Sequence, residues 1–559
     1  MSAPPDLGNY DYVIVGAGSA GCVLANRLTA DPGVRVLLLE AGGEDRNFWL
    51  RLPVGYFKTI YDERFSRIFD AEGGEHVADR VIRWPRGRIL GGSSSINGLI
   101  YIRGQHADYD DWERLGATGW NYRAVLPYFK RSEDYAGPAG PYHGKGGELG
   151  VSDLRNNHAY CERWVEAGRQ LGLPYNPDFN AESEYGVGCY QLSIRGGWRS
   201  SSSVSFLRPV RSRPNLTVVT AAHVSRVLFT GDRATGVEWI HGGHRRVTTV
   251  DREVILSAGA IQSPQILQLS GIGPAALLRG LGIDVRLDAP DVGANLQDHF
   301  QARTIVRLKD RRSLNDQVRN PLALAAMGAQ WLLFNRGPLT VGAGQVGGFA
   351  RTGHAQGGRS DMQFNVMPLS VDKPGDPLHR FSGFTATASQ CRPTSRGRVS
   401  IVGTDPFEPP RIQANYLATD LDRKTVVAGI RMLRDIYRQP AFRDLVDGEV
   451  LPGSQAREDA ELLDFAARHG GTVFHACGTC RMGGDPQAVV TPDLRVQGVR
   501  GLRVVDASVM AAMVSANTNA ASIMIGERGA ALLRGEIPAR VEQPGDEHDE
   551  APVRQGFPS

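Results

Sequence analysis

Short apolar runs separated by glycine-rich turns mark the start of the chain. Residues 12–15 form a continuous apolar run that indicates a buried strand, and residues 20–28 carry apolar positions at helical spacing. Asp31, Pro32 and Gly33 end that helix, and residues 34–39 repeat the buried-strand pattern. A strand, a helix and a second strand within about 30 residues predict a parallel βαβ unit.

The pattern changes twice further along the chain. Strands are expected at 216–220, 224–229 and 253–256, with a hairpin turn at Gly242-Gly243 and a helix over 263–270. From about residue 303 to 476 the strands become mixed and polar, and we expect a second domain there, with a strand at 397–402 and a helix over 423–437. A buried strand at 502–505 and a helix over 519–533 then return to the first pattern, which makes the first domain discontinuous.

Composition and charge exclude several classes of protein. The 559 residues suggest about two to four domains. With 41% hydrophobic and 22% charged residues, the composition is that of soluble globular proteins. A net charge of +3 gives no case for nucleic acid or an anionic membrane as the main partner. Six scattered cysteines do not form a disulfide framework, so a cytoplasmic location is the simpler interpretation.

The two ends of the chain carry no recognisable targeting or anchoring signal. Residues 1–9 lack the basic start of a signal peptide, and no run of about 18 apolar residues predicts a spanning helix. Peripheral contact with a membrane is left open. We expect flexible termini at 1–7 and 541–559, where proline, glycine and acidic residues are frequent.

A dinucleotide fingerprint follows the first predicted strand. Residues 16–21 read GAGSAG, which fits G-x-G-x-x-G and opens the first predicted helix. Gly16 permits the tight turn, Gly18 lets the backbone approach a diphosphate, and Gly21 lets helix and strand pack closely. The helix N-terminus, through Ser19 and Ala20, faces the phosphates with free N–H groups. Glu40 ends the second strand, where its carboxylate can accept hydrogen bonds from ribose; these residues alone do not distinguish FAD from NAD.

Four longer blocks resemble the glucose–methanol–choline (GMC) oxidoreductases. They occur in the family's order and read GRILGGSSSING (87–98), GAIQSPQILQLSGIG (259–273), FHACGTCRMG (474–483) and VDAS through SANTN (505–519). The similarity extends from about residue 10 to 537 and is greatest to the choline-dehydrogenase-like alcohol dehydrogenases and alcohol oxidases.

The resemblance implies FAD as the cofactor and a two-part α/β fold. A discontinuous Rossmann-type FAD-binding domain is expected over 8–155, 208–302 and 477–538, and an α+β substrate-binding domain with an antiparallel sheet over 156–207 and 303–476. Beyond the fingerprint and Glu40, the expected FAD contacts are Ala41, Arg88, Gly91, Gly92, Ser93, Asn97, Gly98, Leu99, Ile100, Val224, Asp506, Ala507, Asn517 and Thr518. Ile96 stands where some family oxidases carry a histidine bonded to the flavin, so we expect non-covalent FAD.

The resemblance also assigns the chemistry to a pair of side chains. His475 matches the family's catalytic base, and histidine suits that task because its pKa lies near neutral pH. Asn517 matches the second active-site position; an amide can hydrogen-bond the substrate oxygen but cannot act as a base. Asn519 is the nearest competitor for that role. The expected reaction is oxidation of an alcohol to an aldehyde or ketone with hydride transfer to flavin N5, followed by reoxidation by oxygen or a quinone-type acceptor.

Several other residues and activities stay open at this level. Cys477 and Cys480 form a C-x-x-C, a spacing shared by zinc sites and redox dithiols, but without a second cysteine pair we expect no metal and interpret them as packing. Further candidates to line the substrate pocket are Gln345, Asn365, Met367, Cys391 and Arg392. The alternatives are a hydroxynitrile lyase or a light-driven fatty-acid decarboxylase on the same fold, and a flavin-binding protein without catalysis.

Overall fold

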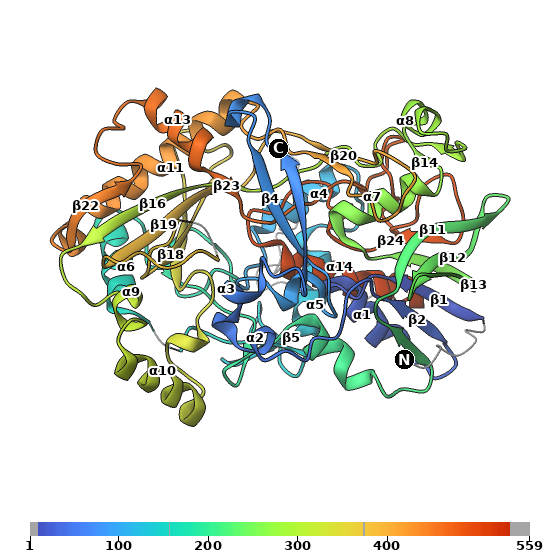
Figure 1. Cartoon of the computed structure of the whole chain (residues 1–559), viewed down its shortest axis with the longest axis horizontal. Coiled ribbons are helices and arrows are strands. Elements are labelled where there is room, and N and C mark those ends of the chain that lie inside the picture. The colour runs from blue at the N-terminus through green and yellow to red at the C-terminus, as the bar shows by residue number, and fades with distance from the viewer. Residues whose placement is uncertain (1–8, 156, 373–374, 537–559) are drawn as a thin grey trace, which may run out of the picture.

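The structure is a computed structural model that describes residues 9–155, 157–372 and 375–536. The flexible termini expected at 1–7 and 541–559 lie outside the described residues. Two sheet-containing parts lie side by side, one around β1, β2 and β13 and the other around β16, β18 and β19, with α14 and α5 between them (Figure 1). Within the described part of the chain, no helix is both long and apolar enough to cross a membrane.

The sheet of the first part is built from the predicted buried strands. Its order is β10-β2-β1-β13-β12-β11, and β24 pairs with β13. Strands β10, β2, β1, β13 and β24 run parallel, whereas β12 is antiparallel to both β11 and β13. The bounds of these strands are β1 Tyr10–Val15, β2 Val36–Leu39, β10 Leu216–Val219, β11 His223–Thr230, β12 Arg233–His241, β13 His244–Leu256 and β24 Leu502–Val504.

Two helices from opposite ends of the chain pack together beside this sheet. They are α1 (Ser19–Leu28) and α14 (Thr518–Arg534). A Cβ on Gly526 would lie 2.9 Å from Cα of Ala20, so glycine is needed where the two helices approach. Arg27 and Glu527 form a buried ion pair at 2.6 Å across the same interface. The predicted return of the C-terminal segment to the first part is therefore confirmed by α14 and β24.

The second part contains the predicted antiparallel sheet, in the order β17-β18-β19-β16-β22. Its strands are β16 Phe300–Leu308, β17 Val346–Ala350, β18 Met362–Met367, β19 Gly383–Gln390 and β22 Val446–Leu451. Helix α11 (Asp420–Arg438) packs on β16 and β19. The strand expected at 397–402 is shorter, β20 Arg398–Ser400, and joins another sheet in the order β20-β21-β3-β4.

That small sheet joins segments far apart in sequence. Its other strands are β3 Ser66–Glu72, β4 Val81–Gly87 and β21 Arg411–Gln413, and β21 runs parallel to β3. The remaining long helices are α4 His106–Arg114, α5 Tyr122–Ser132, α6 Ala159–Gln170, α7 Gly259–Leu269, α10 Pro321–Phe334 and α13 Asp459–His469. The domain boundary expected at 302/303 falls inside β16, and the boundaries themselves stay a prediction.

Candidate active site

A cavity of about 320 Å³ lies between the first parallel sheet and the antiparallel sheet. His475 and Asn517, the expected catalytic pair, both line it. So do nearly all the expected FAD contacts: Gly16, Gly18, Ser19, Ala20, Glu40, Ala41, Arg88, Gly92, Ser93, Asn97, Gly98, Leu99, Ile100, Val224, Asp506, Ala507 and Thr518. Gly21 and Gly91 are not among the residues that line the cavity. The four blocks therefore converge on one cavity, although hundreds of residues separate them in the chain.

The glycines of the fingerprint have different tasks. A Cβ on Gly16, whose φ is +101°, would lie 2.5 Å from the Ser257 carbonyl oxygen, and one on Gly21 would lie 1.9 Å from the Gly16 carbonyl oxygen. A Cβ on Gly18 would meet only the Ser257 oxygen, at 3.8 Å. The backbone at Gly18 is extended, and no side chain caps the N–H groups of α1, which begins at Ser19. Glycine at 18 thus keeps room for a diphosphate in front of a helix N-terminus, which fits FAD.

Glu40 is buried at the end of β2 and faces the cavity. Its two carboxylate oxygens accept hydrogen bonds from the N–H groups of Ala17 and Gly42, each at 2.8 Å. Burial raises the pKa of Glu40 to about 7, against the opposing effect of these two N–H groups and of Arg88. Each oxygen keeps a further lone pair, so hydroxyl donors such as those of ribose fit this position.

The loop after β4 lies against the fingerprint. Gly91 donates from its N–H to the Ala17 carbonyl at 2.8 Å, and a Cβ on Gly92 would lie 2.8 Å from Cα of Gly18. Ser93 lines the cavity, and its Oγ accepts a hydrogen bond from the Gly87 N–H at 3.1 Å. Ile96 also lines the cavity, and a hydrocarbon side chain has no atom that could bond covalently to a flavin.

Asp506 holds two neighbouring turns together beside the cavity. It follows β24, and one carboxylate oxygen accepts from the Gly259 N–H at 2.9 Å and from the Ser263 hydroxyl at 2.6 Å. The other oxygen accepts from the Ser508 N–H at 2.8 Å. Both carboxylate oxygens of Asp506 accept hydrogen bonds from these protein groups. Asp506 therefore holds the backbone that lines this side of the cavity in place.

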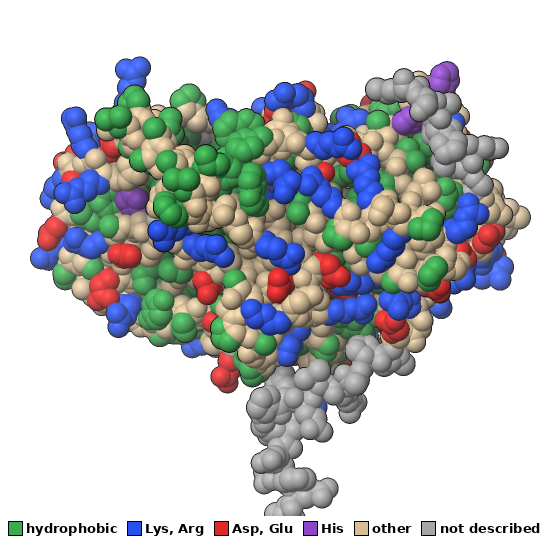
Figure 2. All heavy atoms as spheres, turned by 90° about the horizontal axis from the view of Figure 1, so that it is seen from below, with side chains coloured by type: hydrophobic (Ala, Val, Ile, Leu, Met, Phe, Trp, Pro, Cys, Tyr) green, Lys and Arg blue, Asp and Glu red, His purple; other side chains and the backbone are tan. Residues whose placement is uncertain are grey.

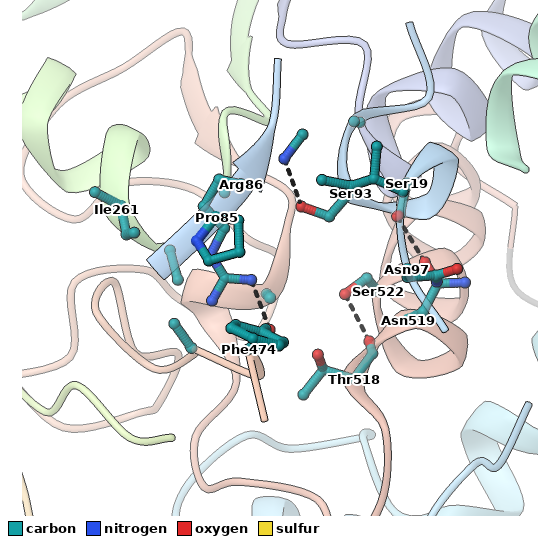
Figure 3. Close-up of a pocket in the computed structure, with 18 of the residues that line it drawn as sticks. Ser19, Pro85, Arg86, Ser93, Asn97, Ile261, Phe474, Thr518, Asn519 and Ser522 are labelled. Atoms are coloured by element: carbon teal, nitrogen blue, oxygen red, sulfur yellow. Dashed lines mark hydrogen bonds between the residues drawn. The ribbon is translucent and has the colours of Figure 1, made fainter. Parts of the chain in front are cut away.

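Side chains from distant segments face one another across the cavity (Figure 3). Arg86 of β4 lies beside Phe474, and its guanidinium donates to the Phe474 carbonyl at 2.6 Å. On the other side, the Ser19 hydroxyl at the start of α1 donates to Oδ1 of Asn519 on α14, at 2.8 Å. Asn519 is the alternative candidate for the second active-site position. Its Oδ1 is used in this hydrogen bond to α1.

The backbone around His475 is fixed by hydrogen bonds in a strained conformation. Phe474 has φ +67°, a left-handed conformation that bulky residues rarely adopt. Its N–H donates to the Thr472 hydroxyl at 2.6 Å, and the His475 N–H donates to Oδ1 of Asp298 at 2.7 Å. Asp298 also accepts from the hydroxyls of Thr472 and Tyr416. These bonds hold the turn that directs the His475 ring toward the cavity.

A second histidine determines which nitrogen of His475 carries the hydrogen. His299 Nε2 lies 2.8 Å from the carbonyl oxygen of Cys391, and a carbonyl only accepts, so this nitrogen is the donor. In neutral His299 the other nitrogen, Nδ1, is then an acceptor, and it lies 2.8 Å from Nδ1 of His475. His475 must therefore donate from Nδ1, which leaves the lone pair on its Nε2. That atom is the one beside Asn517, so the arrangement provides a base at the cavity.

Asn517 occupies the N-cap of α14 but does not cap it. Asparagine at this position usually accepts from the backbone of the first helical turn. Here its Nδ2 lies 3.1 Å from His475 Nε2, to which it donates, and its Oδ1 accepts from Gln363 Nε2 at 3.4 Å. The uncapped N-terminus of α14, at Thr518, also faces the cavity and favours negative charge there.

The electrostatics of the site favour an uncharged base. Burial lowers the pKa of His299 to about 4, so His299 is neutral at pH 7. Burial also lowers the pKa of His475 well below its ordinary value, and the positive charge of Arg86 acts in the same direction. His475 is consequently unprotonated at neutral pH and able to accept a proton from a substrate hydroxyl.

The remaining sequence candidates divide between the cavity and the core. Asn365 and Met367 line the cavity, whereas Gln345, Cys391 and Arg392 do not belong to its lining. Gln345 is buried; Arg392 donates to the Ser360 carbonyl at 2.7 Å. Within the described part of the chain all cysteines are free, and Cys477 and Cys480 are fully buried.

Several residues of the site carried no signal that the sequence could reveal. His299 is 176 positions from His475, and Asp298 meets it only through the backbone. Arg86 and Arg303 line the cavity from strands β4 and β16, in a chain that contains many other arginines. Only the meeting of these strands in space distinguishes them from surface residues.

Comparison with known proteins gives one consistent result. Residues 10–301 and 393–526 match the N-terminal and C-terminal regions that define the GMC oxidoreductases. The chain is 40% identical over 528 residues to an alcohol dehydrogenase [acceptor] of Pseudomonas putida, covering 94% of this chain and 95% of that protein. It is also 40% identical over 538 residues to the mitochondrial choline dehydrogenase of Homo sapiens, covering 94% and 90%.

Solved structures agree with this result. A pyridoxine 4-oxidase from Mesorbium loti has a TM-score of 0.85 at 31% identity, covering 94% of this chain and 100% of that chain. A formate oxidase has a TM-score of 0.90 at 27% identity, covering 95% and 99%. The predicted fold, with a parallel nucleotide-binding sheet and an antiparallel second sheet, is thereby confirmed.

Proposed function

The chain belongs to the GMC oxidoreductase family and is an FAD-dependent oxidoreductase acting on CH–OH groups, and we propose that His475 is the base of this reaction. The observation that carries the proposal is the lone pair on His475 Nε2, which faces the cavity because Nδ1 donates to His299. In the substrate complex the alcohol hydroxyl replaces the Asn517 amide as the donor to His475 Nε2, and His475 takes its proton. Asn517 donates a hydrogen bond to the developing alkoxide.

FAD would be held by the fingerprint, the loop after β4 and the start of α14. When bound, FAD supplies the hydride acceptor at N5 of its flavin ring. Gly18 and the N-terminus of α1 would hold the diphosphate, and Glu40 would hold the ribose. Ile96 supports a non-covalent complex. The final electron acceptor is oxygen or a quinone-type compound.

Anaerobic reduction of the flavin tests this function directly. The purified holoenzyme is mixed with a panel of alcohols in the dark, and loss of flavin absorbance is followed before oxygen or a quinone is added. Bleaching by an alcohol in the dark is the expected result. A hydroxynitrile lyase or a light-driven decarboxylase would leave the flavin oxidised under these conditions, and neither Cys391 nor Arg392 lines the cavity as a carboxylate clamp would have to.

A further inference from the structure

A row of polar side chains crosses the antiparallel sheet where it faces the cavity. Arg303 on β16 is paired with Thr387 on β19, and Thr387 is paired with Asn365 on β18. All three line the cavity. Paired residues on neighbouring strands project from the same face of a sheet, so these side chains form one continuous group, here called the polar row.

The polar row lies one step away from the catalytic pair. The preceding row in register consists of Gln301, Ser389 and Gln363, and Gln363 donates to Asn517. Two residues along a strand advance about 7 Å. The polar row is therefore displaced by about that distance from the residues that contact Asn517.

The polar row offers hydrogen-bonding groups that the protein does not use. Oγ1 of Thr387 and Oδ1 of Asn365 are buried and have no hydrogen-bond partner within the described part of the chain. The Thr387 hydroxyl can donate to an anion, whereas Oδ1 of Asn365 only accepts and suits a donor group of the ligand. The Arg303 guanidinium donates from one nitrogen to the carbonyls of Val371 and Asp372, at 3.2 and 3.1 Å, and forms no ion pair with a described residue. Since a guanidinium has five N–H donors, some of them remain for a ligand.

The fixed charge at this end of the cavity is positive. Among the described residues that line the cavity, only Glu40 and Asp506 are carboxylates, and both accept hydrogen bonds from backbone N–H groups at the nucleotide end. Arg303 and Arg86 line the other end. Resting on the function proposed above, we propose that the polar row binds an anionic group, such as a carboxylate, on the alcohol substrate. The carboxylates that act on Arg303, Asp372 and Asp376, are exposed and lie outside the cavity lining, so a quaternary ammonium alcohol in the cavity would meet the Arg303 cation.

Three matched alcohols test this specificity. Anaerobic flavin reduction by 4-(hydroxymethyl)benzoate, 4-methylbenzyl alcohol and choline is compared in the parent holoenzyme. We expect kcat/KM to be about tenfold to a hundredfold higher for the carboxylate than for the neutral alcohol, mainly because KM is lower. Hydrogen bonds to charged groups stabilise a complex by the corresponding free energy. Choline should be the poorest of the three. Equal rates for the carboxylate and the neutral alcohol, or a preference for choline, would overturn the proposal.

Variants on the same strand separate recognition from folding. Arg303→Met should lower the preference for the carboxylate at least tenfold, and Thr387→Val should lower it less. Arg307→Met is the matched control, because Arg307 is exposed on β16 outside the cavity lining, and it should keep the preference. An unchanged preference in Arg303→Met would refute the role of the polar row.

A binding measurement keeps this inference separate from the proposed function. Titration of the oxidised holoenzyme with benzoate should perturb the flavin spectrum, with affinity lowered at least tenfold by Arg303→Met. If no alcohol bleaches the flavin but this titration behaves as expected, the function is wrong and the anion site stands. If alcohols bleach the flavin but benzoate binds the variant equally well, the anion site is wrong and the function stands.

A second and independent feature is the apolar outer surface of α10. The helix carries no charged residue, and only Met327 and Trp331 among its described side chains are buried. Leu322, Leu332 and Phe334 are 82%, 72% and 58% exposed. Figure 2, viewed from the side on which α10 lies in Figure 1, shows hydrophobic side chains gathered among Lys and Arg side chains. Contiguous exposed apolar side chains on a helix are typical of interaction surfaces.

The charges beside α10 indicate the kind of partner. Arg336, just after α10, and Arg311 and Arg312 are exposed and form no ion pair with a described residue, while Glu162 and Glu166 line the same hollow as Arg312. An isologous contact with a second copy would bring these same cations together. Anionic lipid headgroups complement them, while the leucines can enter the acyl boundary. We infer that α10 docks this protein on an anionic membrane surface.

The inner side of α10 connects this surface to the site. Met327 belongs to a buried cluster with Leu314, Leu369 and Val371, and Met367 packs against that cluster. Val371 and Met367 line the cavity. A membrane beneath α10 would consequently lie next to the substrate end of the cavity.

Flotation with vesicles tests the docking surface. The full-length holoenzyme is mixed with vesicles of phosphatidylcholine alone or with 30 mol% phosphatidylglycerol, and we expect flotation only with the anionic vesicles. Leu332→Glu combined with Phe334→Glu should abolish it with flavin content unchanged. Val247→Glu is the control, because Val247 is 59% exposed on β13, and it should float like the parent. Absence of flotation in the parent, or a self-association that only the double variant loses, would contradict the inference.

Discussion

Nδ1 of His475 and Nδ1 of His299 lie 2.8 Å apart, and the hydrogen between them belongs to His475. The reason is the Cys391 carbonyl at the far side of His299, which can only accept. Cys391 follows β19 of the antiparallel sheet, whereas His475 lies in the turn after β23 (Gly471–Thr472). The protonation pattern of His475 is thus determined by a backbone group that directly follows a strand of the antiparallel sheet.

Replacement of His299 should lower catalysis without loss of FAD. In His299→Leu, His475 loses the acceptor for its Nδ1 hydrogen, and we expect flavin reduction by alcohol to slow by about 10- to 100-fold, the usual effect of removing an orienting partner. His299→Asn is the matched variant, because its Oδ1 can still accept near that position, and its loss should be smaller. Stopped-flow reduction of both variants measures the difference; equal losses would show that His299 has only a packing role.

Replacement of the proposed catalytic pair, His475 and Asn517, should give two different losses of activity. His475→Ala should retain FAD and slow flavin reduction by about 10²–10⁴-fold, the range expected for a positioned general base. Asn517→Ala should cost less, because it removes one hydrogen bond to a developing charge and leaves the base in place. The comparison is made anaerobically, so that reoxidation does not mask the step. A parent-like rate in His475→Ala would mean that another group is the base.

The pH dependence of flavin reduction should reflect the lowered pKa of His475. Because burial and Arg86 disfavour its cation, the base stays neutral as the pH falls, and kcat/KM should change by less than about twofold between pH 8 and pH 6. An imidazole with the ordinary pKa of about 6.5 would be about three quarters protonated at pH 6 and would lose activity in proportion. A midpoint near pH 6.5 in the kcat/KM profile would contradict this expectation.

Two glycines of the fingerprint should fail in different ways. Gly18→Ala should fold but lose FAD, because its Cβ meets only one protein atom, at 3.8 Å, and projects where the diphosphate is expected. Gly21→Ala should be destabilised, because its Cβ would lie 1.9 Å from a backbone oxygen. Flavin content and thermal unfolding of the two purified proteins distinguish these outcomes. Full flavin occupancy in Gly18→Ala would show that the diphosphate lies elsewhere.

Acid treatment should release the cofactor. Since Ile96 lines the cavity with a hydrocarbon side chain, precipitation with trichloroacetic acid should leave FAD in the supernatant and a colourless pellet. Absorbance of both fractions gives the answer. Flavin that stays with the precipitated protein would point to a covalent bond through another residue.

The predicted helices and strands that agree with the structure are those with a strong local pattern of apolar residues. Residues 12–15 lie within β1, and the helices expected at 20–28 and 519–533 correspond to α1 and α14. The strand expected at 397–402 was less accurate: β20 covers only Arg398–Ser400. Mixed polar strands take their length from pairing with partners such as β21, and these partners are not visible in a local window.

The sequence alone determined features that lie in contiguous residues: the βαβ unit, the glycine fingerprint that predicts a diphosphate site, and the four blocks whose order indicates FAD and predicts the pair His475 and Asn517. Only the tertiary structure decided which nitrogen of His475 keeps its lone pair, since that depends on His299 and on the Cys391 carbonyl. It also decided that Arg303, Thr387 and Asn365 stand in one row. Hydrogen bonds and strand register are relations between distant residues, and composition or spacing does not record them.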